Sequence, residues 1–528
     1  MLYRKGQLVF CSFLIILVSC NPYPKGEQEA TSESRSFSTS FKPMVFLEDN
    51  RNEKIKSIAS DFDHLIEEYA KNKHIPGIAY GIVVDDDLIV TGATGFINIE
   101  DSLIATPRSC FRIASMTKSF TAMAILMLRD DGKLSLDDPV EKYIPEMYDL
   151  EYLTRDAPVI TIENLLTMTA GFPEDNPWGD RQLEETDQML MDLIADGLSF
   201  SNPSSYQFEY SNTGYALLGN IITRVANTPY QDYIREKILH PLEMYQTYWE
   251  YDSVPEEQLA LGYRWEDEQW KLEPMLHDGS YGAMGGLITT IEDFAKYVSF
   301  HLSAWPPRND PDHGPVRRST LREMQTIRNP SLYASAKDLN GDPCALIYGY
   351  GFGLGVNEDC HGFKTVNHGG ALPGFGGGYD FYPDYGVGIM AFCNLTYTAP
   401  IPRREAYRIL LESTEIEPRQ LPASDILLKK QEQVTALIQN WDKGLEMEIL
   451  AENFYLDKSR ERRISDISEM LDKAGVIDST GELQPENQLR GSYKLHAEHG
   501  DIGIYFTLTP EKHPKVQQLE VTFDPSEN

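Results

Sequence analysis

The sequence predicts a mixed α/β fold of the α+β kind, followed by a smaller α+β domain. In the first part, an amphipathic helix is followed by a β-hairpin and then by a helix that is apolar on almost every face. In the second part, beyond residue 421, helical periodicity gives way to strict alternation of apolar and polar residues. The chain has 528 residues, which allows about two or three domains.

The N-terminus has the features of a secretory signal. Residues 1–20 contain basic Arg4 and Lys5, an apolar run over 8–18, and Ser19 before Cys20. The run is too short to cross a bilayer as a helix and therefore predicts a signal peptide. Residues 17–20 resemble a bacterial lipobox, which implies cleavage before Cys20 and lipidation of its thiol. The alternative is an ordinary secretory signal with a chance cysteine.

Residues 21–50, rich in Ser, Thr, Glu and Pro, are expected to form a flexible tether between the lipid and the folded chain. We therefore expect an exported protein, lipid-anchored to the cell envelope in the outer membrane or periplasm. Its contact with the membrane would be made through the lipid.

Composition limits the possible partners. The formal charge of −34 argues against nucleic acid and against electrostatic attachment to anionic lipid. No C-x-x-C or H-E-x-x-H pattern is present, so we expect no metal and no cofactor. Export would permit a disulfide, and Cys344 with Cys360 is the nearest pair, but buried free thiols fit the sequence equally well.

The folded part begins with a helix predicted over about 53–72, ended by residues 74–77. Residues 78–84 and 88–91 flank three aspartates and predict a β-hairpin. The next segment, 111–128, has the sequence FRIASMTKSFTAMAILML, and its second half is apolar all round. A helix of that kind belongs in the middle of a domain.

Ser115 and Lys118 stand three residues apart at the start of this helix, so they share one face. A serine hydroxyl needs a neighbouring base, and a lysine can act as one when burial makes its proton easier to lose. The positive end of the helix would favour an oxyanion beside Ser115. The alternative is a capping serine followed by a solvated lysine.

A second constellation is Tyr210 with Asn212, the only Y-x-N in the sequence, before an apolar helix over 215–225. Near Lys118 the phenol could share or relay the serine proton, and Asn212 could bind a substrate amide. The common alternative is a tyrosine packed under a loop beside a capping asparagine.

The third constellation is His368, Gly369 and Gly370, placed after strands predicted at 350–356 and 363–366. A second hairpin, GGYDFYP and VGIMAFC, follows it. An imidazole beside two glycines lets a substrate backbone approach and offers a donor for its carbonyl or carboxylate. His277 also begins an H-x-G, but we favour His368 because strands flank it on both sides.

These three motifs resemble, in order, the signature of the serine β-lactamase and penicillin-binding protein superfamily, and the Y-x-N form is similar to its class C and D,D-peptidase branch. The resemblance implies a domain over 51–415 with a β-lactamase-like antiparallel sheet flanked by helices, plus a helical subdomain. It implies Ser115 as nucleophile, with Lys118 and Tyr210 as coupled bases that the sequence does not rank. Asn212 and His368 would orient the substrate, and the backbone N–H groups of Ser115 and Ala371 would hold the oxyanion.

The function we predict is an exported serine hydrolase that forms an acyl-enzyme on a small D-amino-acid peptide, a related amide or an ester, including peptidoglycan-derived substrates. Class C β-lactamases carry lysine in the third motif, whereas this chain has His368, as in D-aminopeptidase-like relatives. A true β-lactamase is the enzymatic alternative. A non-catalytic binding or sensor lipoprotein is the alternative of another class. Substrate choice should depend on loops such as 173–181 and 305–315.

The remaining segment, 421–528, is predicted to be a small α+β domain. Helical periodicity over 426–441 is followed by alternation around 493–495, 502–508 and 519–523, which predicts a helix packed on a meander. It is loosely similar to the NTF2-like fold. It carries no catalytic pattern.

Overall fold

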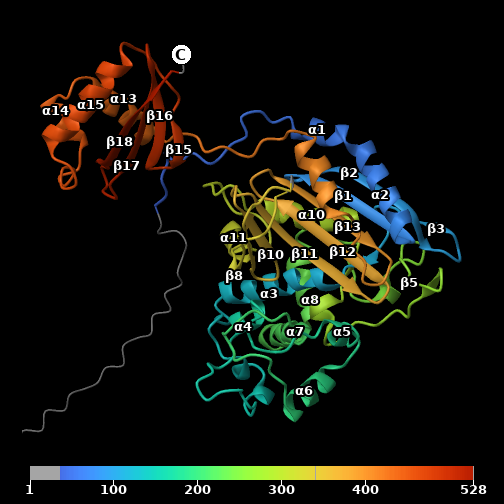
Figure 1. Ribbon diagram of the computed structural model, residues 1–528. Coiled ribbons are helices and arrows are strands. Elements are labelled where there is room, and N and C mark those ends of the chain that lie inside the picture. Colours follow the sequence, from blue (N-terminus) through green and yellow to red (C-terminus); the bar gives the residue numbers. More distant parts are fainter. Residues whose placement is uncertain (1–35, 339–340, 527–528) are drawn as a thin grey trace, which may run out of the picture. The chain divides into compact units, whose positions relative to one another are not determined.

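The computed structural model describes residues 36–338 and 341–526. Its largest element is a β-sheet against which helices pack (Figure 1). The predicted signal peptide, Cys20 and most of the predicted tether lie outside these residues. Within the described part of the tether, Val45 already forms a β-bridge with Gln420.

A nine-stranded sheet forms the centre of the first part, and all its neighbouring strands are antiparallel. In spatial order the strands are β3 (Leu103–Ile104), β2 (Asp87–Asn98), β1 (Gly77–Val84), β13 (Val387–Cys393), β12 (Phe375–Tyr382), β11 (Lys364–Leu372), β10 (Gly355–Asp359), β9 (Leu346–Tyr350) and β8 (Arg328–Tyr333). Two short ribbons pair β4 (Phe111–Arg112) with β7 (Ile288–Thr289), and β5 (Tyr263–Glu266) with β6 (Gln269–Leu272).

Both faces of the sheet are buried, as the alternation along β1 shows. Ile82 belongs to a core shared with α1 (Arg51–Ser57) and α2 (Ala59–Lys73), whereas its neighbour Val83 belongs to the larger core on the opposite face. That larger core includes α10 (Ile291–Leu302) and α3 (Lys118–Asp130). The predicted antiparallel sheet flanked by helices is therefore confirmed.

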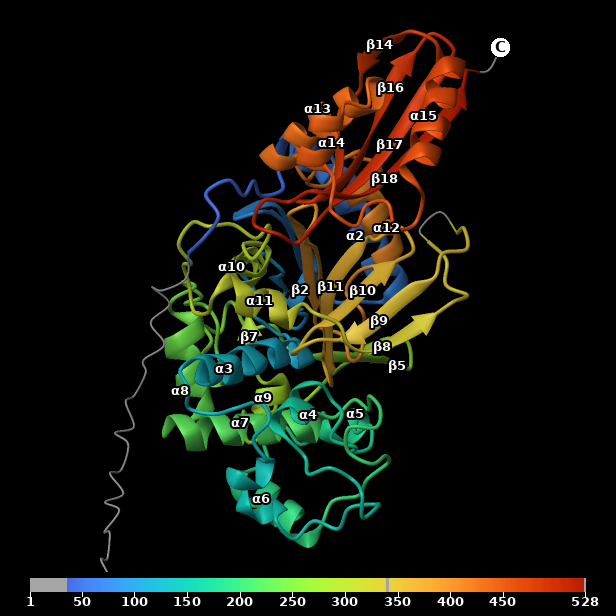
Figure 2. The ribbon, with the colours of Figure 1, turned by 90° about the vertical axis from the view of Figure 1, so that its left-hand side faces the viewer.

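A group of helices continues from the larger core on the side of α3, and several of them pack against α3 (Figure 2). These helices are α4 (Ile162–Leu166), α5 (Asn176–Gly179), α6 (Asp187–Asp196), α7 (Asn212–Ala226), α8 (Tyr230–Ile234), α9 (Gly282–Gly285) and α11 (Arg318–Met324), while α12 (Arg403–Tyr407) packs on the α2 side. Ten of the thirteen residues of α3 are buried, as its all-round apolar sequence predicts.

The C-terminal segment has a core of its own. Its helices are α13 (Asp425–Gln439), α14 (Lys443–Ile449) and α15 (Arg460–Ala474). Its strands are β14 (Ile477–Thr480), β15 (Gln484–Asn487), β16 (Arg490–Ala497), β17 (Gly500–Leu508) and β18 (Val516–Pro525), with β16, β17 and β18 forming the predicted meander. Its similarity to the NTF2-like fold stays a prediction.

Three expectations about elements need correction. The helix expected over 53–72 is two helices, because the backbone leaves the helical region at Ile58. The strand expected over 350–356 is two strands separated by a turn at Gly353, whose positive φ of 72° requires glycine. His368 lies within β11 rather than after a strand, and the polar helix α15 was not foreseen.

The structure joins Cys344 to Cys360 in a disulfide, and Cys110 and Cys393 are buried free thiols. His361 lies close enough to both sulfurs to complete a three-ligand metal cluster, but the disulfide occupies them. Among the described residues, no helix has both the length and the apolar composition of a membrane span.

Candidate active site

Ser115 lies in a turn of 3-10 helix, Ala114–Thr117, that leads directly into α3. The preceding strand β4 is held by β7, and Ala114 adopts a positive φ of 50°, which redirects the chain from strand to helix. Ser115 is 7% exposed, at the N-terminal end of a long apolar helix. The predicted position of the serine at the head of this helix is therefore what the structure shows.

Lys118 begins α3 and is completely buried. Its Nζ donates to Ser115 Oγ at 2.9 Å, to Asn212 Oδ1 at 2.7 Å and to the Met284 carbonyl at 3.0 Å. Burial lowers the pKa of Lys118 to about 7, while the carboxylates of Asp180 and Asp175 act in the opposite direction. A lysine in this state can accept a proton near neutral pH.

Tyr210 and Asn212 reach the same place from the start of α7. Ser211 caps that helix, since its Oγ accepts from the Gly214 N–H at 3.1 Å, and this fixes the residues on either side. The Tyr210 phenol and the Ser115 hydroxyl face the same cavity, and the Tyr210 ring centre is 5.0 Å from Lys118 Nζ. Burial raises the pKa of Tyr210 above its usual range, so the phenol stays protonated.

The sequence did not show that Asn212 also has partners behind it. Its Nδ2 donates to Asn176 Oδ1 at 3.2 Å and to Asp180 Oδ1 at 3.4 Å, while its Oδ1 faces Lys118. Asp175 accepts from the backbone N–H of Asn212 at 2.6 Å and of Thr213 at 2.9 Å. The loop 173–181 thus supplies the cavity with acidic and amide groups, whereas no residue of 305–315 lines it.

His368 lies on β11 and is 6% exposed. Its Nδ1 is 2.6 Å from the Gly369 carbonyl, which can only accept, so Nδ1 carries the proton and Nε2 accepts from the Tyr350 hydroxyl at 2.9 Å. Burial lowers the pKa of His368 to about 3, so the ring is neutral. Both nitrogens are engaged, and a hydrogen bond from His368 to a substrate would require one of these partners to be displaced.

Two glycines let the sheet approach the serine turn. A Cβ at Gly370 would lie 2.1 Å from the Ile113 carbonyl oxygen, and one at Gly377 would lie 2.8 Å from Met116 Sδ. At Gly369, by contrast, the nearest atom to a Cβ would be 3.8 Å away, so its missing side chain leaves open space. Gly370 is therefore required for close packing beside Ser115, and Gly369 widens the cavity.

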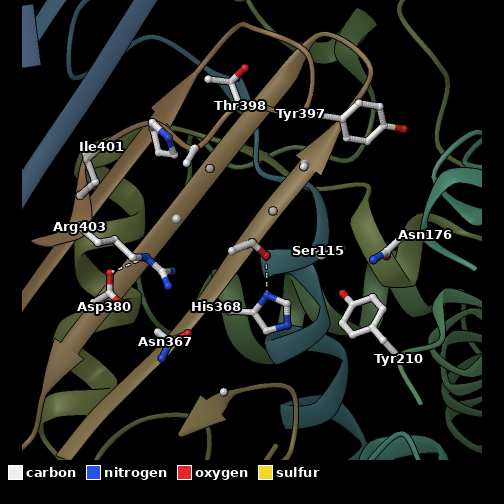
Figure 3. Close-up of a pocket in the computed structure, with 18 of the residues that line it drawn as sticks. Ser115, Asn176, Tyr210, Asn367, His368, Asp380, Tyr397, Thr398, Ile401 and Arg403 are labelled. Atoms are coloured by element: carbon white, nitrogen blue, oxygen red, sulfur yellow. Dashed lines mark hydrogen bonds and ion pairs between the residues drawn. The ribbon is translucent and has the colours of Figure 1, made fainter. Parts of the chain in front are cut away.

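These residues line one cavity of about 600 Å³ (Figure 3). It contains the predicted Ser115, Tyr210, His368, Gly369, Gly370 and Ala371, while the buried Lys118 and Asn212 contact it from behind. Asp380 and Arg403 also line it, as an ion pair with Nε and Oδ2 3.3 Å apart. Neither had been predicted. The competing His277 lies outside the cavity lining, exposed, and pairs with Glu250 and Tyr251.

Comparison with known proteins identifies the family of the chain. The sequence model of the Beta-lactamase family, described as "Beta-lactamase", matches residues 62–414, so the chain belongs to that family. With this fold, it is a member of the serine β-lactamase and penicillin-binding protein superfamily. The members of this superfamily are generally serine hydrolases.

Among its relatives are "Beta-lactamase-like protein 2" of Dictyostelium discoideum, 30% identical over 351 residues, and "Protein flp" of Staphylococcus aureus, 30% identical over 342 residues. The matches cover 65% and 63% of this chain, but only 58% and 62% of those relatives. The chain therefore spans about three fifths of the length of the curated relatives that it matches.

Two solved structures share the fold. The octameric penicillin-binding protein homologue from Pyrococcus abyssi has a TM-score of 0.55 and 23% identity, over 89% of this chain and 96% of that chain. The penicillin-binding protein from Bacillus halodurans has a TM-score of 0.50 and 23% identity, over 66% of this chain and 98% of that chain.

Proposed function

We propose that the protein is a serine hydrolase that works through an acyl-enzyme on Ser115. The observation that carries the proposal is the 2.9 Å contact between Ser115 Oγ and the buried Lys118 Nζ, together with the lowered pKa of Lys118. The protonated amine donates to the serine hydroxyl, and the neutral amine, which burial favours, can instead accept the hydroxyl proton and so activate the nucleophile.

The chemistry follows from the positions of the groups. Ser115 Oγ attacks a substrate carbonyl carbon and its proton passes to Lys118 Nζ. Because the Tyr210 phenol remains protonated, it acts as a donor and relay beside Oγ, and it can deliver a proton to the leaving group as the carbon–heteroatom bond breaks. The N–H groups of Ser115 and Ala371 would hold the oxyanion. Lys118 then passes its proton to the Tyr210 phenolate, so both groups return to their starting states. Water attacks the ester carbonyl and gives a proton to Lys118, which passes it to Ser115 Oγ as the ester C–O bond breaks and the carboxylic acid leaves.

The charges of the cavity support a preference among substrates. Its lining includes the carboxyl groups of Asp180 and Asp380, and Arg403 is already paired with Asp380. His368 is neutral. The described cavity therefore lacks an uncompensated cation for a substrate carboxylate. This favours D-aminoacyl amides, peptides with a free amine, and esters over peptides that end in a carboxylate at the scissile residue.

The neutral His368 also argues against efficient β-lactam hydrolysis, since a penicillin carries a carboxylate beside its reactive amide. A D,D-carboxypeptidase faces the same difficulty. If the chain instead serves as a binding or sensor protein with this fold, substrates should acylate Ser115 slowly or not at all.

A substrate panel tests the proposal on the chain from Lys42 onward. We expect turnover of D-alanine p-nitroanilide and p-nitrophenyl acetate to exceed that of N-acyl-D-alanyl-D-alanine and penicillin by about 10-fold or more. L-Alanine p-nitroanilide is the matched control for configuration. Turnover confined to penicillin would establish the β-lactamase alternative. No turnover and no fluorophosphonate adduct would leave only the binding protein.

We further propose that the protein is exported and anchored through a lipid on Cys20. The disulfide between Cys344 and Cys360 supports an oxidising compartment. With the full-length gene expressed in a bacterial host, radiolabelled palmitate should enter the wild type and be absent from Cys20→Ala. Equal labelling of both would contradict the anchor, and secretion of unlabelled wild type would indicate an ordinary signal peptide.

A further inference from the structure

The loop that carries Asp180 is fitted onto the start of α7. At one end, Asp175 accepts from two backbone N–H groups of that helix and from the Thr213 hydroxyl. In the middle, a Cβ at Gly179 would lie 2.8 Å from Asn212 Cβ, so only glycine lets the loop pack there. Asp180 follows directly and is 3% exposed. A buried carboxyl group is therefore held beside Asn212 by contacts on both sides.

One carboxamide connects Asp180 to the lysine. Asn212 Oδ1 accepts from Lys118 Nζ at 2.7 Å, and Asn212 Nδ2 donates towards Asp180 Oδ1 at 3.4 Å. The two ends of a carboxamide have opposite hydrogen-bonding character. Acceptors behind Nδ2, from Asp180 and Asn176, thus keep Oδ1 turned towards Lys118.

We propose that Asp180 is a positioning residue for Lys118: through Asn212 it holds the amide oxygen on Nζ, and its charge stabilises the protonated lysine. This inference rests on the proposed function of Lys118 as base. When Lys118 takes the Ser115 proton, a cation forms in a fully buried site. An ion in such a site needs a counter-charge, and Asp180 supplies one without contacting the substrate carbonyl itself.

The other groups around the lysine do not replace Asp180. Lys118 is faced by the Ser115 hydroxyl, the Met284 carbonyl and two tyrosine rings, and by the neutral His368. Asp175 is the other nearby carboxylate, but its oxygens are bound to the N-terminus of α7.

The groups around Asp180 itself are few. Besides the Asn212 amide, they are Lys118, Asp175, Glu174 and the Tyr397 hydroxyl, which is in turn near Arg181. Burial raises the pKa of Asp180, and the lysine cation acts against this. The charge of Asp180 is therefore coupled chiefly to that of Lys118.

Asp180→Asn tests the proposal, because it keeps the shape and removes the charge. Activity needs neutral Lys118, so kcat/KM for p-nitrophenyl acetate should rise with pH through the lysine pKa. Without the carboxylate the protonated lysine loses stabilisation, so its pKa should fall. The rise of kcat/KM on the acidic side of the pH profile should therefore move to lower pH by about one unit. Glu184→Gln is the matched control, because Glu184 lies in the exposed loop that follows. It should leave the pH dependence of kcat/KM unchanged.

A second readout does not depend on catalysis. In full-length protein labelled with ¹³C at lysine Cε, the NMR titration of Lys118, assigned with Lys118→Met, should have its midpoint lowered in Asp180→Asn. An unmoved midpoint, or one moved to higher pH, would overturn the inference even if activity falls, because a purely structural role would lower activity equally at every pH. Absence of any activity in the wild type would refute the proposed function alone, and the NMR titration would still decide the role of Asp180.

Discussion

Replacing Ser115 with alanine should remove covalent labelling and lower kcat/KM by roughly ten-thousand-fold, the loss typical of a serine nucleophile. The side chain is 7% exposed and loses only its Oγ, which accepts from Lys118 at 2.9 Å. The fold should therefore persist. Intact mass after incubation with a fluorophosphonate, together with initial rates on p-nitrophenyl acetate, measures both effects.

Ser119→Ala is the matched control. Ser119 lies on the same helix and is also buried, but its Oγ donates to the Met116 carbonyl at 2.9 Å and does not line the cavity. The adduct should survive in this variant, with at most a few-fold change in rate. An adduct that persists in Ser115→Ala, or disappears in Ser119→Ala while the protein stays folded, would contradict the assignment of the nucleophile.

Replacing Lys118 with methionine should lower kcat/KM by about a thousand-fold or more, since the hydroxyl then has no base. Methionine matches the length and apolar character of the lysine stem in a site with no solvent exposure. The substitution leaves Asn212 Oδ1 and the Met284 carbonyl without their donor, so some stability should be lost. Rates over pH 5–9 and thermal unfolding separate the two effects.

Lys118→Arg distinguishes a base from a cation. Arginine keeps the positive charge and the donors but does not lose its proton in this range. If Lys118 acts as base, the arginine variant should be as inactive as the methionine variant. Substantial activity in folded Lys118→Arg would show that the charge alone suffices, and would transfer the role of base to Tyr210 or to a solvent species.

Several parts of this site follow from local sequence. The spacing of Ser115 and Lys118 places them on one turn, and an all-round apolar helix has to be buried, so a buried lysine beside a serine could be expected. Tyr210 and Asn212 flank a capping serine, which fixes them at a helix start. The hairpin of β12 and β13 follows from its glycines and its turn. In each case the interacting residues are close in the chain.

Other parts depend on contacts between distant segments. The sequence contained Asp175 and Asp180, but only the docking of their loop on α7 places the carboxyl groups near Lys118. The pattern around His368 indicated a donor to the substrate, whereas packing against Tyr350 makes the ring neutral and uses both its nitrogens. The turn at Gly353 divides a run that looks like one strand, because it packs on α3.

The order of the three motifs indicated the superfamily by resemblance. The local elements that carry the reactive groups could be predicted because helix periodicity, caps and hairpins are set by residues a few positions apart. The protonation states and the shape of the cavity depend on contacts between remote segments. Burial and opposing charge shift the pKa of Lys118, Asp180 and His368, and these depend on which remote segments exclude water from each group. The residue pattern along the chain does not specify which distant segments exclude water from a given side chain.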